Sequence, residues 1–256
     1  MFECYLDISN GSGKPSAQFA CCTGYLAHEA VRGWFNQHWC HLLLKHDLPG
    51  ISLESWSDVV RRRGWDVTTS REVLADFTRA IETHDLIGFV VVMDAAGWNA
   101  LAANERRVFG SASNFCFLRV VRLVLDRLEA ANRTAPITIV FDQTLDRLAH
   151  RSTAVHTLFE MDSRAIDRVD SIRFSNPARH FQLQATKLLT SMTRRRLAEL
   201  PGASLRLPAW LRKLDELPAA EETGVWEHWD KAFTRRHAGS IEWDMPRATS
   251  TRSRRN

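Results

Sequence analysis

Two runs of β-branched and aromatic residues, 87–94 and 137–142, most constrain what this chain can fold into. Both runs are apolar almost throughout and both end in aspartate, as expected of central strands that are covered on both faces. Between them, residues 115–131 repeat apolar side chains at the spacing of one buried helical face. A strand, a helix and a second strand in this order predict an α/β domain with helices on the faces of its sheet.

Weaker patterns extend this core on both sides. Residues 10–15 contain two glycines and a proline and predict a turn between two N-terminal strands. Thr69-Ser70-Arg71-Glu72 is a capping box, which predicts that a helix begins there. We therefore expect a mixed sheet flanked by helices. The other expected elements are strands at 2–7, 18–25 and 171–174 and helices at 28–46, 143–166 and 181–197.

The chain divides into three parts by composition. Residues 1–200 carry the alternating strand and helix patterns and are expected to form one α/β domain. Residues 201–246 are spaced by prolines and rich in tryptophan, and we expect a helical extension that packs against the main body. The last ten residues, 247–256, contain four arginines and no acidic residue. Because the whole chain has 34 basic and 30 acidic residues, this tail, expected to be disordered, accounts for the net charge of +4.

Cysteine usage and hydropathy predict a cytoplasmic location. The five cysteines are an odd number without C-x-x-C spacing, which favours reduced, buried thiols over a disulfide framework. The N-terminal residues show no basic stretch followed by an apolar one, so we expect no signal peptide. The longest strongly apolar run, about residues 86–93, is far too short to span a bilayer, and we expect no membrane partner.

Asp7 and Asp142 are two of the aspartates that end expected strands. If these strands are neighbours they lie about 4.8 Å apart, and carboxylates at equivalent heights are then close enough to share a divalent cation. Hydrated Mg²⁺ is commonly held by one or two carboxylates together with substrate phosphates. An aspartate after a strand is also a frequent turn former or helix cap, so both interpretations stay open.

The order of the motifs resembles that of a known family. Residues 5–11 match a strand that leads into an Asp-Glu-Ser-Gly motif, and 139–142 match an apolar strand ending in Phe-Asp. Residues 114–117 match the opening of a central helix, and 183–190 match a closing helix that begins Leu-Gln-x-Ala-Asp-Leu-Leu-Ala. In these features, which cover about residues 1–200, the chain is similar to the bacterial domain-of-unknown-function-3800 family. The resemblance implies an RNase-H-like fold with a nuclease-type metal site.

The chain departs from the family pattern at the positions that would hold metal. The glutamate that follows the first aspartate is replaced by Ile8, and the aspartate of the closing helix is replaced by Lys187. A histidine-containing segment of the family corresponds to residues 51–54, which lack histidine. Of the metal-binding carboxylates that the resemblance implies, Asp7 and Asp142 remain at matching positions.

Lys187 is the basis of the first hypothesis for function. An ammonium group repels a metal dication a few ångströms away but attracts carboxylates, so Lys187 is expected to replace the metal and to pair with Asp7 and Asp142. The site would then be vestigial, and the chain a catalytically impaired binding or accessory protein that needs no cofactor. Its partner would be nucleic acid or a protein, and the oligomeric state is left open.

A competing hypothesis keeps the site active. A Mg²⁺- or Mn²⁺-dependent nuclease would use Asp7 and Asp142 and would need another acid. Asp94, at the end of its own expected strand, is the first candidate, followed by Glu54 and Asp146.

Basic residues offer a separate contact with nucleic acid. Arg194, Arg195 and Arg196 lie at the end of the closing helix, and residues 61–63 form a second arginine run. Guanidinium groups match phosphate oxygens, but cations also favour helix C-termini, so both interpretations stay open. The histidines of the first expected helix, His38, His41 and His46, are better explained as surface or interface side chains than as metal ligands.

Overall fold

The fold is given by a computed structural model that describes residues 1–9, 19–51, 56–84, 86–142, 148–177, 180–199 and 224–229. Within these residues the strands are β1 (Phe2–Ser9), β2 (Phe19–His28), β3 (Ile87–Asp94), β4 (Ile137–Asp142), β5 (Val169–Ser175) and β6 (Gly224–Trp229). The helices are α1 (Glu29–Lys45), α2 (Trp56–Arg63), α3 (Val67–Thr83), α4 (Ala95–Ala100), α5 (Ala103–Phe109), α6 (Ala112–Ala130), α7 (Leu148–Met161), α8 (Ser163–Arg168) and α9 (Phe181–Glu199).

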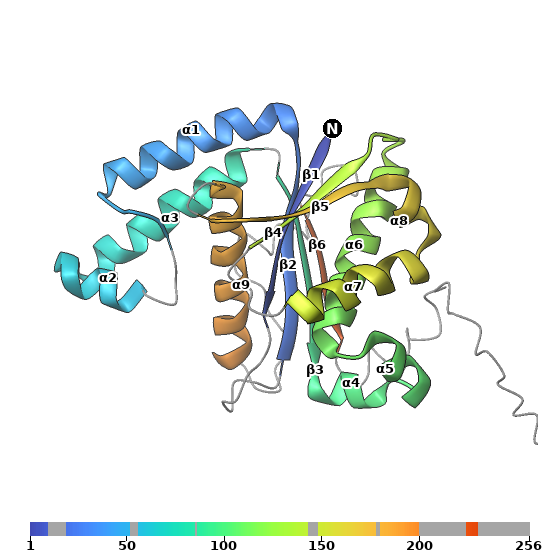
Figure 1. Cartoon of the computed structure of the whole chain (residues 1–256). Helices are drawn as coiled ribbons and strands as arrows, with labels where there is room; N and C mark the ends of the chain where they lie inside the picture. The colour runs from blue at the N-terminus through green and yellow to red at the C-terminus, as the bar shows by residue number, and fades with distance from the viewer. Residues whose placement is uncertain are drawn as a thin grey trace, which may run out of the picture.

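The strands form one six-stranded mixed sheet in the order β5-β4-β1-β2-β3-β6 (Figure 1). β1, β2 and β3 form an antiparallel meander, in which Tyr5 pairs with Tyr25. β4 lies parallel to β1 on its other side, and β5 lies parallel to β4. Both parallel strands follow helical segments, because a parallel pair needs a long crossover connection. The expected mixed α/β sheet with flanking helices is confirmed.

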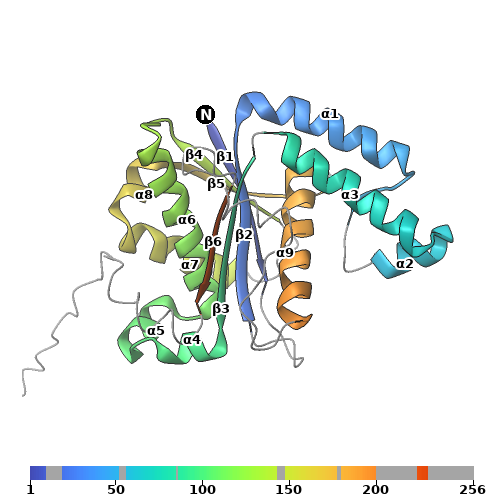
Figure 2. The ribbon, with the colours of Figure 1, turned by 180° about the vertical axis from the view of Figure 1, so that it is seen from behind.

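Helices cover both faces of the sheet (Figure 2). α6 lies against β2 and β3 on one face, where Phe117 and Val121 are buried together with Leu6 of β1. α1, α3 and α9 cover the other face, where Leu188 of α9 belongs to a second apolar cluster. Because successive side chains of a strand point to opposite faces, the odd-numbered residues of β1 lie on the α9 face and Leu6 lies on the α6 face.

The helix near residue 70 begins earlier than its capping box predicts. α3 starts at Val67, and its cap is Asp66, whose carboxylate accepts a hydrogen bond from the Thr69 amide at 2.7 Å. This hydrogen bond lowers the pKa of the Asp66 carboxyl. Aspartate and threonine are both good caps, so local preference alone does not select between the two possible starts.

Short helices occupy stretches in which the sequence predicts none. α2, α4 and α5 contain eight, six and seven residues. Helices of this length are marginal in isolation and depend on tertiary contacts, here the burial of Trp56 in α2 and Phe109 in α5. In the described part of the chain, no single helix has the length and apolar character to cross a bilayer, and α5 and α6 meet these criteria only together, across a bend of 79°.

The predicted helical extension is wrong over residues 224–229. These residues form β6, which pairs in parallel with β3 from Gly88↔Gly224 onwards. Without β6, the edge of β3 would present unpaired N–H and C=O groups, and the valine and tryptophans of β6 favour a strand. The partners of this pairing are 136 positions apart, so a local pattern does not predict it. The rest of 201–246 and the tail at 247–256 lie outside the described residues.

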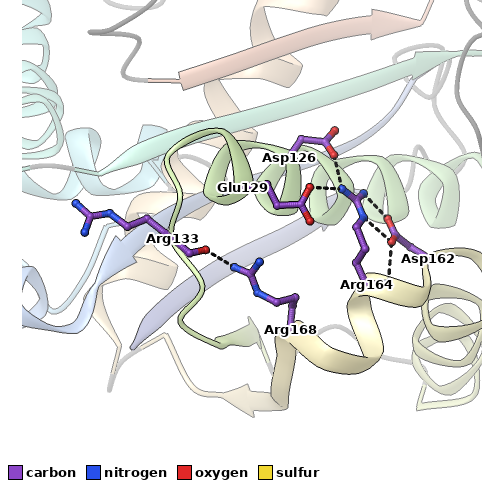
Figure 3. A network of polar contacts seen from close by, with 6 residues as sticks. All are labelled: Asp126, Glu129, Arg133, Asp162, Arg164 and Arg168. Carbon is purple, nitrogen blue, oxygen red and sulfur yellow. Dashed lines mark hydrogen bonds and ion pairs between the residues drawn. The ribbon is translucent and has the colours of Figure 1, made fainter.

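A polar network attaches α8 to α6 (Figure 3). Arg164 donates to the carboxylates of Asp162 at 2.7 Å, Asp126 at 2.8 Å and Glu129 at 2.9 Å. Asp162 is buried and also accepts from the Arg164 amide as the cap of α8. The hydrogen bond to Asp162 raises the pKa of Arg164 most, and the hydrogen bond to Asp126 also raises it. Desolvation by burial acts in the opposite direction, but the pKa is raised overall. The network therefore fixes the short helix that leads into β5.

We predict that Arg164→Gln lowers the free energy of unfolding by about 2 kcal/mol, because the buried Asp162 carboxylate loses its cation. Urea denaturation followed by circular dichroism measures the change. Arg107→Gln, on the exposed surface of α5, is the matched control and should change stability by less than about 0.5 kcal/mol. Equal midpoints for the two variants would contradict the role assigned to Arg164.

Candidate functional site

Asp7, two residues before the end of β1, and Asp142, the last residue of β4, lie on neighbouring strands. The parallel register of these strands runs to Leu6↔Phe141, and Asp7 and Asp142 are the next residue of each strand. Two positions earlier, Tyr5 and Val140 contact the same helix, α9, so alternation places both carboxylates on the α9 face. Both aspartates are buried, with 8% of Asp7 and 1% of Asp142 exposed.

Lys187 of α9 forms an ion pair with Asp142. Leu183, one helical turn earlier, packs on Tyr5 and Val140, and this contact brings the following turn over the strand ends. The Lys187 side chain is 33% exposed, whereas the Asp142 side chain is 1% exposed. The cation therefore keeps contact with water while it neutralises a carboxylate that has almost none.

Hydroxyl groups attach α9 to the sheet beside this ion pair. Thr23, the β2 partner of Asp7, lies 2.6 Å from the Thr190 hydroxyl. Thr190 also bonds to the Thr186 carbonyl at 3.0 Å, and the Thr186 hydroxyl donates to the carbonyl of Tyr5 at 3.4 Å. These buried contacts fix the rotation of α9 and with it the direction of Lys187. The sequence analysis does not identify them, although the spacing of threonines at 186, 190 and 193 is helical.

Charged groups at this end of the sheet shift the pKa of the Cys21 thiol. Cys21 lies on β2, two residues before Thr23 and on the same face. The pKa of the Cys21 thiol is raised to about 12, chiefly by burial and also by the Asp7 carboxylate, while the Arg194 guanidinium acts to lower it. Arg194 of α9 therefore acts electrostatically on the same region as Asp7. The side chain of Arg194 is exposed, and those of Arg195 and Arg196 lie outside the described residues.

The structure does not bring Asp94 to the pair formed by Asp7 and Asp142. Asp94 lies opposite Phe19 of β2, whereas Asp7 lies opposite Thr23. These β2 positions are four residues apart, which corresponds to about 13 Å along a strand. The Asp94 carboxylate caps α4, accepting from the Gly97 amide at 2.5 Å. The other candidate acids, Glu54 and Asp146, lie outside the described residues.

The histidines of α1 have partners of their own. His38 Nδ1 lies 3.1 Å from His84 Nε2, and His46 Nε2 lies 3.0 Å from the Asp76 carboxylate. His41 is exposed. In the part of the chain that the structure describes, no group of three or more histidine, cysteine, aspartate or glutamate side chains is arranged to hold a metal ion.

A second polar cluster lies at the opposite end of β1 and was not expected from the sequence. The Tyr5 hydroxyl donates to the buried Glu3 carboxylate at 2.5 Å, and Arg32 of α1 donates to the same carboxylate at 3.0 Å. Burial and the hydrogen bond to Glu3 raise the pKa of the Tyr5 hydroxyl. Burial lowers the pKa of the nearby His180. The cluster attaches α1 to β1 through a charge-assisted contact.

Known proteins give no assignment of this site. No protein-family model matches the chain, and no curated protein matches it either. The chemical meaning of the site therefore rests on its geometry: two buried strand-end carboxylates on neighbouring strands, one of them paired with a lysine.

We predict that Lys187→Met and Asp142→Asn each destabilise the protein by about 1–3 kcal/mol, because each leaves a mostly buried charge without its partner. The double variant should lose less unfolding free energy than the two single variants lose together. The difference is the coupling energy, which we expect to be about 1–2 kcal/mol. Lys45→Met is the control, since Lys45 pairs with Asp76 at an exposed position and should cost less than about 1 kcal/mol. Strict additivity would contradict the ion pair.

We also predict that a single thiol among the five cysteines reacts rapidly with Ellman's reagent at about pH 8. Burial raises the pKa of Cys4 and Cys21 to about 12 and that of Cys22 and Cys116 well above its ordinary value, whereas Cys40 is partly exposed. Cys40→Ser should remove the rapid phase, and denaturant should release the remaining thiols. Rapid labelling of the Cys40→Ser variant would show that at least one of the four buried thiols is accessible.

Proposed function

We propose that this chain is an RNase-H-like domain with a degenerate metal site, which is catalytically impaired and acts as a binding or accessory protein. The observation that carries the proposal is the ion pair between Lys187 and Asp142, at the end of the strand where the family resemblance expects a metal ligand. The proposal separates the scaffold, which is retained, from the phosphodiester chemistry, which is lost.

The strand arrangement supports the fold assignment. An antiparallel meander followed by two strands parallel to its first strand is the arrangement of RNase-H-like sheets, and here β1, β2 and β3 are followed by β4 and β5 in that relation. The first and fourth strands are adjacent, so the acids that end them meet at one edge. β6 is an addition at the far edge, next to β3.

Electrostatics support the loss of metal. Two unit charges 4 Å apart interact by about 4 kcal/mol at an effective dielectric constant of 20, and a dication doubles this value. Lys187 therefore disfavours a divalent cation beside Asp142 while it stabilises the buried carboxylate. A metal pair would also need more oxygen ligands than two aspartates supply. The alternative, an active nuclease that recruits Asp94, is less well supported because Asp94 caps α4 at a distant register position.

The test is to restore the acid. We predict that Lys187→Asp gains binding of Mn²⁺ or Mg²⁺ that the natural chain lacks, since a third carboxylate then replaces the cation beside Asp142. Calorimetric titration measures the binding, and Mn²⁺ should raise the melting temperature of Lys187→Asp alone, because a ligand that binds only the folded state stabilises it. Arg107→Asp, which adds the same charge on the exposed face of α5, is the matched control.

Two results would overturn the proposal. One is tight Mg²⁺ or Mn²⁺ binding by the natural chain that Asp142→Asn abolishes. The other is metal-dependent cleavage of single- or double-stranded DNA or RNA by the natural chain, again lost in Asp142→Asn. Either result would establish an active site in which Lys187 has a different role.

A further inference from the structure

The helices α2 and α3 are joined by a short turn and form a two-helix unit. Three residues separate them: Gly64, Trp65 and the cap Asp66. Gly64 has a φ of 63°, a left-handed conformation that glycine adopts without strain. A short first helix, a three- or four-residue turn containing glycine and a longer second helix are the elements of a helix-turn-helix.

Aromatic contacts hold the two helices as one body. Trp56 of α2 is buried, and its indole N–H donates to the Ser70 hydroxyl of α3 at 2.9 Å. Its ring lies 5.8 Å from that of Trp65 in the turn. Val73 and Phe77 of α3 are buried in the same apolar cluster. The buried side of α3 is therefore fixed, and its opposite side has a defined orientation.

The outward side of this unit is small and basic. Val67, Thr68, Arg71 and Ala75 are exposed at helical spacing along the first turns of α3, with Val67 67% exposed. In both views the unit lies at the end of the α1–α3 arm, with α2 at its tip, away from the sheet (Figures 1 and 2). Arginine, threonine and small apolar side chains at the start of an exposed helix are the groups that contact base edges in the major groove.

The last turn of α2 supplies positive charge next to this stripe. Its three residues are Arg61, Arg62 and Arg63, all exposed. Arg61 and Arg63 form exposed ion pairs with Asp58 and Asp47, which are weak contacts that a phosphate can replace. Among the described residues, Arg62 and Arg71 have no acidic partner within ion-pair distance. In a helix-turn-helix the first helix crosses the phosphate backbone, so exposed guanidinium groups on α2 are suited to contact phosphates.

We propose that α2 and α3 form a docking surface for double-stranded DNA, with the first turns of α3 in the major groove and the arginines of α2 on the phosphates. A helix about 10–12 Å in diameter fits the B-form major groove, which is about 12 Å wide. Glu72, which is exposed beside Arg71, is an acidic group that can accept a hydrogen bond from the amino group of cytosine. This surface includes neither Lys187 nor Asp142, so the test of DNA docking is independent of the test of the proposed degenerate metal site.

The experiment measures fluorescence anisotropy of a labelled DNA duplex of about 20 base pairs, titrated with the full chain at about 50 mM salt and above. We expect Arg62→Ala/Arg71→Ala to weaken binding about tenfold or more and to lower the salt dependence by about two counterions. Both side chains are exposed, so the fold should be unaffected. Arg107→Ala removes an exposed arginine from α5 and should leave the affinity unchanged.

Any one of four outcomes would overturn the proposal. The natural chain fails to bind duplex DNA at low salt, or the double variant binds as well as the natural chain. Alternatively, replacing Arg252, Arg254 and Arg255 by alanine removes all binding, which would assign it to the C-terminal tail. Duplex RNA is a further arm: its deep, narrow major groove does not admit a helix, so equal affinity for RNA would exclude the proposed docking mode.

Discussion

Burial of the Asp142 carboxylate is the constraint on which the candidate site depends. An ionised carboxylate inside a protein is costly unless a cation or several hydrogen bonds compensate for the lost water. β4 is an inner strand, and its parallel alignment with β1 brings a second acid to the same edge and the same face. The groups above these two carboxylates must therefore carry positive charge or donate hydrogen bonds. In this chain the compensating charge comes from Lys187 on α9.

A lysine and a metal ion meet this requirement in different ways. A divalent cation requires a shell of oxygen ligands at defined positions, and it can bind phosphate oxygens as part of that shell. An ammonium on a four-carbon stem asks only for a nearby acceptor and leaves its outer side hydrated. Lys187 supplies such an ammonium beside Asp142, and the threonine contacts of α9 fix the rotation of the helix that carries it.

How much the sequence predicts depends on whether a feature is local. β3 and β4 are predicted with their bounds, because a continuous apolar run is typical of a strand covered on both faces. Asp94 and Asp142 look alike in the sequence, each ending such a run, yet one caps a helix and the other forms an ion pair. That distinction depends on strand register, which is set by the whole sheet. Only the family resemblance predicts that Asp7 and Asp142 are adjacent. The sequence does not predict the hydroxyl contacts of Thr186 and Thr190 that attach α9 to the sheet.

The position of β6 has a consequence for the order in which the sheet can be assembled. β1 to β5 lie within the first 175 residues, so these strands can pair while later residues are still being synthesised. β6 begins at Gly224, and its partner Gly88 belongs to a strand that leaves the ribosome 136 residues earlier. Through that interval the outer edge of β3 lacks its final neighbour. An open strand edge on a nascent chain is a template for pairing with other chains, so the synthesis of residues 224–229 also closes this border of the sheet.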